Sequence, residues 1–215
     1  MSDYIQQIAH DFEPANHLND EYKEVAQNNN SFNSAMAALD NPFAAPELVI
    51  DLYLIEYILE EISALSTQLR GSIAENDIRI TDGRWSREQR NDYNILFSFV
   101  GQSLEFLLKK SVFKYILAED AKTSEVKNMV FGLKGYWGIS VSECLDYLYN
   151  AEIIDDGLKG NIKQAWEYRC EAVHNLRGSF FSRPSVDEVE VQIGHAERAI
   201  VRLIEITFEI KLEST

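Results

Sequence analysis

The spacing of apolar residues is the feature that most limits how this chain can fold. From Pro46 onward, apolar side chains recur at intervals of three and four residues in long segments, as expected for amphipathic helices. We find no convincing alternation of apolar and polar residues that would predict a strand. The pattern predicts four long antiparallel helices over residues 47–70, 87–118, 156–177 and 186–212.

Helix-start and helix-stop signals refine these boundaries. Gly71 suits the position just beyond the first long helix, and a loop is expected from there to Trp85. Either Asp155 or Asp156 is expected to cap the third long helix, and short helices are expected at residues 124–131 and after Ser140. The predicted fold class is all-α, an up-and-down four-helix bundle with short inserted helices. Three capping boxes, each a serine followed three residues later by Gln or Glu, are Ser86 with Gln89, Ser140 with Glu143 and Ser185 with Glu188.

The first 45 residues differ in composition from the rest. They hold seven acids, the single base Lys23 and a run of three asparagines at residues 28–30. Such a segment buries little apolar surface. We therefore predict an acidic, Asn-rich, partly ordered N-terminal arm over residues 1–45 and one helical domain over residues 46–215.

Composition excludes several classes of protein. An apolar fraction of 46% in 215 residues is enough to bury a core. The formal charge of −15 argues against a protein that coats DNA, because phosphate binding requires clustered Lys and Arg. Two cysteines are too few for a disulfide scaffold and indicate a reducing compartment. Without a signal-like start or an apolar stretch near 18 residues, we expect a cytoplasmic protein with no membrane partner.

Most other candidate residues have simpler interpretations. His10, His17 and His195 lack a Cys or His at metal-ligand spacing, so no metal site is predicted. Trp85, Trp137 and Trp166 are expected to anchor the core rather than to stack on bases. Cys144 and Cys170 are expected to be small helix residues.

Arg169 and His174 are the one pair that predicts chemistry. Five residues of helix turn by about 500°, which leaves the two side chains roughly 140° apart. They cannot share a face of a straight helix, although the long arginine side chain can curl toward a groove edged by the histidine. From residue 159 to residue 183 there are five bases and two acids, so this is the place where a phosphate polymer would bind. Lys163, Arg177 and Arg183 are the candidate RNA-binding residues.

These bases also have a purely structural interpretation. An arginine or a histidine near the carboxyl end of a helix stabilises the helix dipole without any function. For Arg177 and Arg183 we favour the interpretation as plain surface bases.

The region around the pair resembles the HEPN superfamily, the higher eukaryotes and prokaryotes nucleotide-binding domains. Those domains carry an Arg, four to six intervening residues and a His near the end of the third long helix, as Arg169 and His174 do with four between. The upstream stretch from Ser142 to Leu148 is also similar to the lead-in of such domains, and the resemblance covers about residues 47–212. It implies a homodimer with both motifs in one cleft and no cofactor. Cys170 departs from the family, whose active ribonucleases have Asn, Asp or His there.

Two classes of function remain open. The resemblance implies a metal-independent endoribonuclease, acting as a toxin or defence effector neutralised by an antitoxin or another protein partner. In it a 2′-hydroxyl of RNA attacks the adjacent phosphate while catalytic Arg169 and His174 stabilise charge and move the proton. The alternative is a non-catalytic HEPN-like module that binds a protein partner or a nucleotide. The acidic composition favours the module, and the Arg-His pair favours the enzyme.

Overall fold

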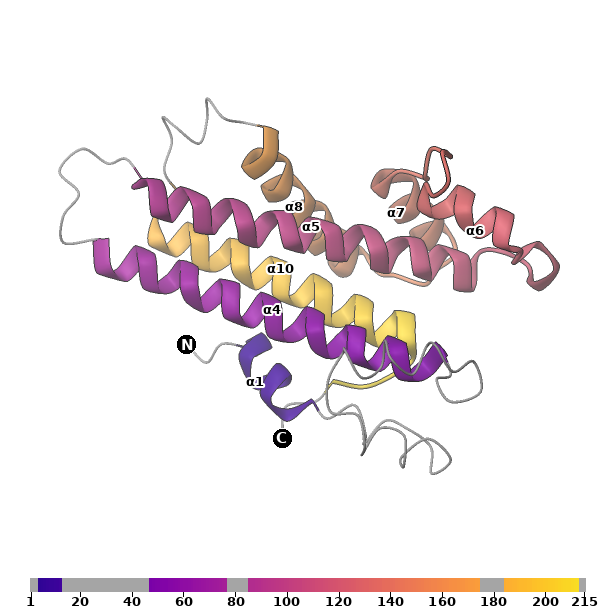
Figure 1. Cartoon of the computed structure of the whole chain (residues 1–215), viewed down its shortest axis with the longest axis horizontal. Helices are drawn as coiled ribbons and strands as arrows, with labels where there is room; N and C mark the ends of the chain where they lie inside the picture. Colours follow the sequence, from indigo (N-terminus) through magenta and orange to yellow (C-terminus); the bar gives the residue numbers. More distant parts are fainter. Residues whose placement is uncertain (1–3, 13–46, 77–84, 175–183, 213–215) are drawn as a thin grey trace. The chain divides into compact units, whose positions relative to one another are not determined.

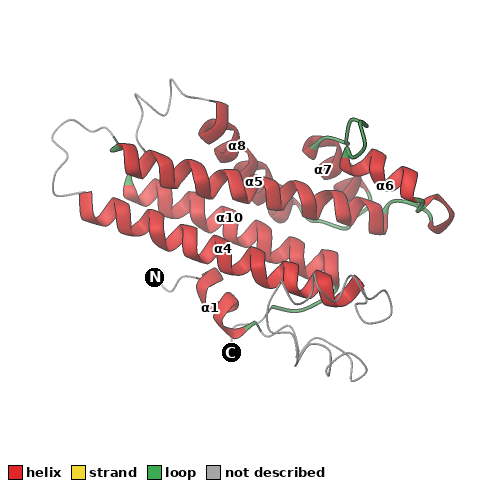
Figure 2. Ribbon diagram, viewed as in Figure 1, coloured by secondary structure: helices red, strands yellow, loops and turns green. Residues whose placement is uncertain are grey.

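In the computed structural model of this chain, the described residues are 4–12, 47–76, 85–174 and 184–212. Every regular element within them is a helix, which confirms the all-α prediction (Figures 1 and 2). The elements are α1 (Tyr4–Asp11), α4 (Glu47–Asn76), α5 (Arg87–Tyr115), a 3-10 turn (Glu119–Ala121), α6 (Ser124–Phe131), α7 (Val141–Asn150), α8 (Asp156–His174) and α10 (Val186–Phe208).

The helix starts follow the capping signals of the sequence. At α5, the Ser86 hydroxyl accepts a hydrogen bond from the Gln89 amide at 3.1 Å, and the Gln89 side-chain oxygen accepts one from the Ser86 amide at 2.9 Å. The same reciprocal bonds open α7 and α10. At α8, Asp155 rather than Asp156 is the cap, because its Oδ1 accepts the Leu158 amide at 2.7 Å. All three predicted capping boxes are therefore confirmed.

Gly71 does not end α4, so this predicted stop is wrong. The helix continues to Asn76 because the next turn is held by contacts from elsewhere in the chain. Ile73 is buried, and the side-chain amide of Gln89 on α5 donates to the Ser72 carbonyl oxygen at 3.1 Å. A glycine costs a helix only about 1 kcal/mol, which such contacts offset.

The helices α5 and α10 end earlier than predicted, α5 at residue 115 instead of 118 and α10 at residue 208 instead of 212. Side chains of α5 donate hydrogen bonds to backbone carbonyl oxygens in the last turn of α10. Lys114 Nζ donates to the Thr207 oxygen at 3.0 Å, and the Tyr115 hydroxyl donates to the Ile206 oxygen at 2.7 Å. Glu209 then adopts a left-handed conformation that stops α10.

The chain divides into two compact units. The first consists of residues 1–64 and 210–215, and the second of residues 65–209. The predicted boundary at residue 45 stays a prediction, because residues 13–46 lie outside the described part. Within the described part of the first unit, α1 buries Ile5 and Ile8, and the predicted apolar stripe of α4 is buried at Leu52, Ile55, Leu59 and Ile62.

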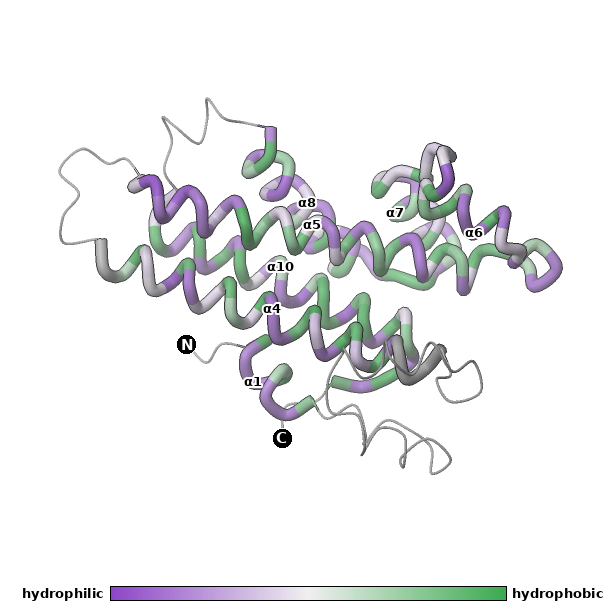
Figure 3. The backbone as a smooth tube through the Cα atoms, viewed as in Figure 1, coloured by the Kyte–Doolittle hydropathy of each residue, from purple (hydrophilic) through white to green (hydrophobic). Residues whose placement is uncertain are grey.

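The second unit is built around α5, α8 and α10, which pack against one another, while α6 and α7 pack against α5. Tyr93 near the start of α5 donates to Gln192 near the start of α10, and Ser111 meets Thr207 near their ends. These two helices therefore run in the same direction, and α8 runs in the opposite one (Figure 1). Apolar residues recur along these helices (Figure 3), and the buried ones include Leu96, Phe97, Val100, Leu104, Leu107 and Leu108 of α5, Leu158, Ile162 and Ala165 of α8, and Ile193, Ala196, Ile200 and Leu203 of α10.

The three tryptophans have different surroundings. Trp85 is buried, with its ring edge-on to Tyr93 at 4.9 Å, as expected for a core anchor. Trp166 is half-buried on α8. Trp137 is 98% exposed, so its predicted place in the core is wrong. The glycines around it place this residue on a loop between α6 and α7 rather than on a helix face.

Candidate functional site

Arg169 lies on α8 with its side chain directly against α5. The opposing residue on α5 is Gly101, and a Cβ atom built there would lie 2.3 Å from Cγ of Arg169 and 3.1 Å from its Cδ. Ordinary contacts between carbon atoms are about 3.5–4.0 Å. The aliphatic stem of Arg169 therefore fits only because residue 101 has no side chain.

The guanidinium of Arg169 reaches His174, the last described residue of α8. Arg169 Nη1 and His174 Nε2 are 3.1 Å apart. A guanidinium has no acceptor, so it must donate, and His174 must accept at Nε2 with its own proton on Nδ1. The pair meets despite the angle between positions 169 and 174, because the arginine side chain curls along the helix.

Trp166 supports the other side of the same guanidinium. The Cζ atom of Arg169 lies 4.9 Å from the centre of the Trp166 ring, within the range of a cation–π interaction. Trp166 is one turn before Arg169 on α8, so this contact is local to the helix. Arg169 thus has three supports, namely Gly101 on α5, Trp166 and His174.

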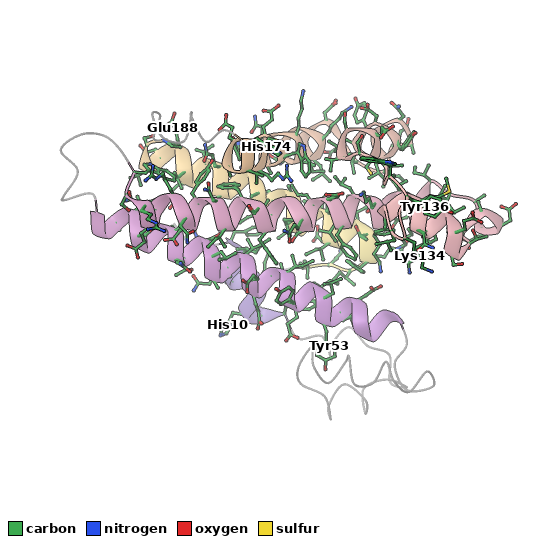
Figure 4. The ribbon with its side chains drawn as sticks, turned by 45° about the horizontal axis from the view of Figure 1, so that its top comes forward. His10, Tyr53, Lys134, Tyr136, His174 and Glu188 are labelled. Carbon is green, nitrogen blue, oxygen red and sulfur yellow. The ribbon has the colours of Figure 1, made fainter. Side chains whose placement is uncertain are left out.

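Solvent reaches the polar ends of both side chains. His174, labelled in Figure 4, is exposed. Arg169 is half-buried. A guanidinium held in place but not enclosed can approach an anion that arrives from solution. The neutral imidazole beside it can accept a proton. This arrangement suits the binding of a phosphate diester next to a proton acceptor.

The other predicted site residues are only partly placed. Lys163 is exposed on α8, six residues and about 9 Å along the axis before Arg169. Arg177 and Arg183 lie outside the described residues. Cys170, which follows Arg169, is half-buried with a free thiol.

Sequence reasoning missed two residues of this site. Gly101 could have been noticed as an isolated glycine inside a strong helical pattern, which often marks a close approach. Trp166 is expected from the sequence to anchor the core, whereas it is half-buried and its ring also contacts the Arg169 guanidinium. Neither contact can be derived from the Arg-x4-His spacing.

A second cluster of polar side chains, formed by Asn161 of α8 with His195 and Arg198 of α10, connects these two helices. His195 Nδ1 lies 2.8 Å from Asn161 Oδ1, and Arg198 Nη2 is 3.4 Å from the same nitrogen. Burial, with a smaller contribution from the Arg198 charge, lowers the pKa of His195 below 6.5. The neutral ring donates from Nδ1 to Asn161, and it lies 6.4 Å from the Tyr168 ring, measured between centres.

The described segments show neither a metal-binding cluster nor a membrane-spanning helix. They contain no group of three or more His, Cys, Asp or Glu side chains placed to hold a metal ion. None of their helices is long and apolar enough to cross a lipid bilayer. No protein-family model, curated protein or solved structure matches this chain.

Proposed function

We propose that this protein is a metal-independent endoribonuclease in which Arg169 and His174 carry the reaction. The observation that supports it best is the 3.1 Å contact between Arg169 Nη1 and His174 Nε2 at the exposed end of α8. It joins a permanent anion binder to a neutral proton acceptor. The resemblance of the Arg-x4-His motif to HEPN domains supports the same function.

The reaction needs no nucleophile from the protein. His174 Nε2 takes the proton of an RNA 2′-hydroxyl, and the 2′-oxygen attacks the adjacent phosphorus. The bond from phosphorus to the 5′-oxygen breaks, leaving a 2′,3′-cyclic phosphate and a 5′-hydroxyl. The leaving oxygen takes a proton from the protonated histidine of a second copy of the chain. Arg169 stabilises the charge that builds on the other phosphate oxygens.

The contact between the two side chains also suggests how substrate switches the site. Without RNA, the lone pair of His174 Nε2 is occupied by the Arg169 guanidinium. A phosphate diester is a charged and therefore stronger acceptor than a neutral imidazole. When the guanidinium turns to the phosphate, Nε2 becomes available as the general base. The contacts of Arg169 with the Trp166 ring and with Gly101 keep its side chain close to His174 while the guanidinium moves to the phosphate.

The proposal includes a homodimer and a HEPN-like, up-and-down four-helix arrangement. One chain supplies one Arg169 and one His174, whereas the two proton transfers require two histidines. The opposite directions of α8 and its neighbours α5 and α10 support this arrangement. Lys163, together with Arg177 and Arg183, is proposed to attract the RNA backbone. The cellular role proposed is that of a toxin or defence effector neutralised by a protein partner.

The test is cleavage of a single-stranded, fluorescently labelled RNA by the purified full chain in the presence of EDTA. Loss of a general acid-base group costs about 10²- to 10⁴-fold in rate. His174→Ala should therefore lower the cleavage rate at least about 100-fold, and Arg169→Ala comparably. Products should end in a cyclic phosphate, and a 2′-deoxy residue at the cleaved position should block the reaction.

Matched controls exist for both variants. His10→Ala removes another exposed histidine, and Arg202→Ala removes an arginine whose partner is Glu205 on the same helix. Both controls should cleave like the parent chain. Cleavage that survives His174→Ala and Arg169→Ala, or that disappears with EDTA, would refute the proposal.

The alternative is a non-catalytic HEPN-like module that binds a protein partner or a nucleotide. The formal charge of −15 favours it, as does Cys170 at the position where active relatives of the motif have Asn, Asp or His. Induced expression separates the two functions. Growth arrest that His174→Ala abolishes supports the enzyme, whereas unchanged growth together with no cleavage of any RNA supports the module.

A further inference from the structure

The loop from Gly132 to Gly138, between α6 and α7, presents an apolar surface that the Arg-His pair does not use. Trp137 is 98% exposed at this loop, and it is accompanied by Leu133, Met129 and Tyr136, which are 49%, 47% and 41% exposed. A tryptophan is seldom so accessible, because burying its large ring is strongly favourable. Clusters of exposed apolar side chains mark binding sites, whereas single exposed apolar side chains are ordinary on protein surfaces.

The loop is held in shape by its two terminal glycines. Gly132 has a left-handed backbone with a φ of 70°, and a Cβ atom there would lie 2.8 Å from the Gly138 nitrogen. A Cβ on Gly138 would in turn lie 3.0 Å from the Gly132 nitrogen. The two ends therefore meet closely, and the Ile139 amide donates to the Val130 oxygen at 3.2 Å across this neck. Residues 133–137 are presented by a closed and preformed loop.

A buried lysine of the second unit lies directly against the neck of the loop. Lys109 of α5 is 5% exposed and donates to Glu105 Oε1 at 2.5 Å. Its Nζ lies so close to the neck that a Cβ on Gly138 would be 2.7 Å from it. A scaffold that holds an exposed aromatic ring in this way lowers the entropy lost when the ring binds a ligand.

The charges beside the rings indicate which ligand fits. Between residues 125 and 138 there are two bases, Lys127 and Lys134, and one acid, Glu125, which accepts a hydrogen bond from the Tyr136 hydroxyl at 3.3 Å. This stretch therefore has a net charge of +1 in a chain with 35 acids and 20 bases. Two copies of this loop packed together would bring four lysines and two glutamates close to one another, and the excess of positive charge opposes self-association. Flat rings of Tyr136 and Trp137 beside ammonium groups suit a ligand that combines planar groups with anions.

We propose that the Gly132–Gly138 loop is an accessory site for single-stranded RNA, with a base stacked on Trp137 and a neighbouring phosphate near Lys134. The choice of RNA rests on the proposed function. Lys109, beneath the loop, is eight residues after Gly101 on α5, or about 12 Å along the helix. Figure 4 accordingly shows Lys134 and Tyr136 toward the carboxyl-terminal end of α5, away from His174. One RNA strand would thus contact the loop a few nucleotides from the cleaved bond.

The test measures binding separately from cleavage. The probe is a fluorescein-labelled 2′-O-methyl oligoadenylate of 12 nucleotides, which has no 2′-hydroxyl to attack and is titrated by fluorescence anisotropy. Trp137→Ala should weaken binding about 5- to 150-fold, the range for loss of one stacked base. Trp137→Phe should restore most of it, because any aromatic face can stack. Lys134→Gln should lower the slope of log affinity against log salt by about 0.7.

Leu133→Ala is the matched control, since it shortens an exposed apolar side chain of the same loop without removing a ring. It should leave oligonucleotide binding unchanged. Equal losses from Leu133→Ala and Trp137→Ala, together with concentration-dependent self-association of the parent chain that both variants abolish, would identify a protein interface and overturn the proposal. Unchanged binding in Trp137→Ala, or no binding of the probe by the parent chain, would also overturn it.

The failure of this inference can be distinguished from the failure of the proposed function. If His174→Ala abolishes cleavage but Trp137→Ala does not alter probe binding, only the accessory site is refuted. If Trp137→Ala weakens probe binding but no RNA is cut, only the ribonuclease is refuted. When both hold, Trp137→Ala should raise the KM for a long RNA while leaving cleavage of a dinucleotide unchanged.

Discussion

Gly101→Ala tests most directly whether the absence of a side chain at residue 101 makes room for the Arg169 side chain. The new Cβ atom would lie 2.3 Å from Arg169 Cγ, where ordinary contact between carbons begins at about 3.5 Å. One side must therefore move by more than about 1 Å. The α5 backbone is fixed on both sides by Val100 and Leu104, which are fully buried. We expect the Arg169 stem to shift and to draw its guanidinium away from His174.

The magnitudes follow from two opposing effects on stability. Replacing glycine by alanine inside a helix favours folding by about 0.5–1 kcal/mol. Overpacking a close contact costs about 1–3 kcal/mol. We expect a net loss of about 1 kcal/mol in the free energy of unfolding, measured by urea denaturation. A displacement near 1 Å at a catalytic group can cost about 100-fold, so RNA cleavage should fall by roughly that factor.

Gly160→Ala provides the control, because this glycine lies inside α8 and a Cβ there would meet nothing within 4 Å. It should stabilise the protein slightly and leave cleavage unchanged. A double-mutant cycle adds a test that does not depend on activity. Arg169→Ala removes the clashing Cγ and leaves only the Cβ of residue 169, 3.2 Å from the new atom, so most of the cost of Gly101→Ala should disappear in that background. Additive effects of Gly101→Ala and Arg169→Ala on the free energy of unfolding would refute the contact between these two residues.

Three further predictions concern assembly and titration. The chain should be a homodimer at tens of micromolar by light scattering, and a monomer would contradict the composite site. Burial raises the pKa of the Cys144 thiol to about 12, so one thiol per native chain, that of Cys170, should react with a disulfide reagent at pH 8, and two after unfolding. The lowered native pKa of His195 means that the unfolded state binds more protons, so stability should fall as pH drops from 6.5 toward the native pKa. His195→Gln should flatten this part of the curve of melting temperature against pH, and an unchanged slope would assign the effect elsewhere.

Local signals predicted the helices well because their causes are local. An N-terminal cap depends on residues three apart, so Ser86 and Gln89 could be paired from sequence and are paired in space. The end of α4 was missed for the opposite reason. Whether the helix continues past Gly71 depends on a hydrogen bond from Gln89 to Ser72, seventeen residues apart, and on the burial of Ile73. No window of the sequence around Gly71 contains that information.

The exposed Trp137 shows a different limit of sequence reasoning. Aromatic side chains are normally buried, and nothing in the composition of residues 130–140 contradicts that expectation. What places the ring in solvent is the meeting of Gly132 and Gly138, which closes the loop and turns its middle outward. The glycines were visible as breaks in the helical pattern. The distance between them in space was not.

The geometry of the Arg-His pair depends both on neighbours in sequence and on a distant residue. The spacing of Arg169 and His174 alone therefore does not predict whether the two side chains meet. A separation of five residues puts the two side chains on different faces of α8, so a helix by itself does not bring Arg169 to His174. Trp166, three residues before Arg169, offers its ring as a platform that any helix with this sequence would have. The decisive contact comes from Gly101, which lies 68 positions earlier and lets the arginine stem lie flat against α5. A chain with the same Arg-x4-His motif but a larger residue at the position of Gly101 would therefore hold its arginine elsewhere. In this chain the position of the Arg169 side chain thus depends on the glycine that faces it as well as on the motif.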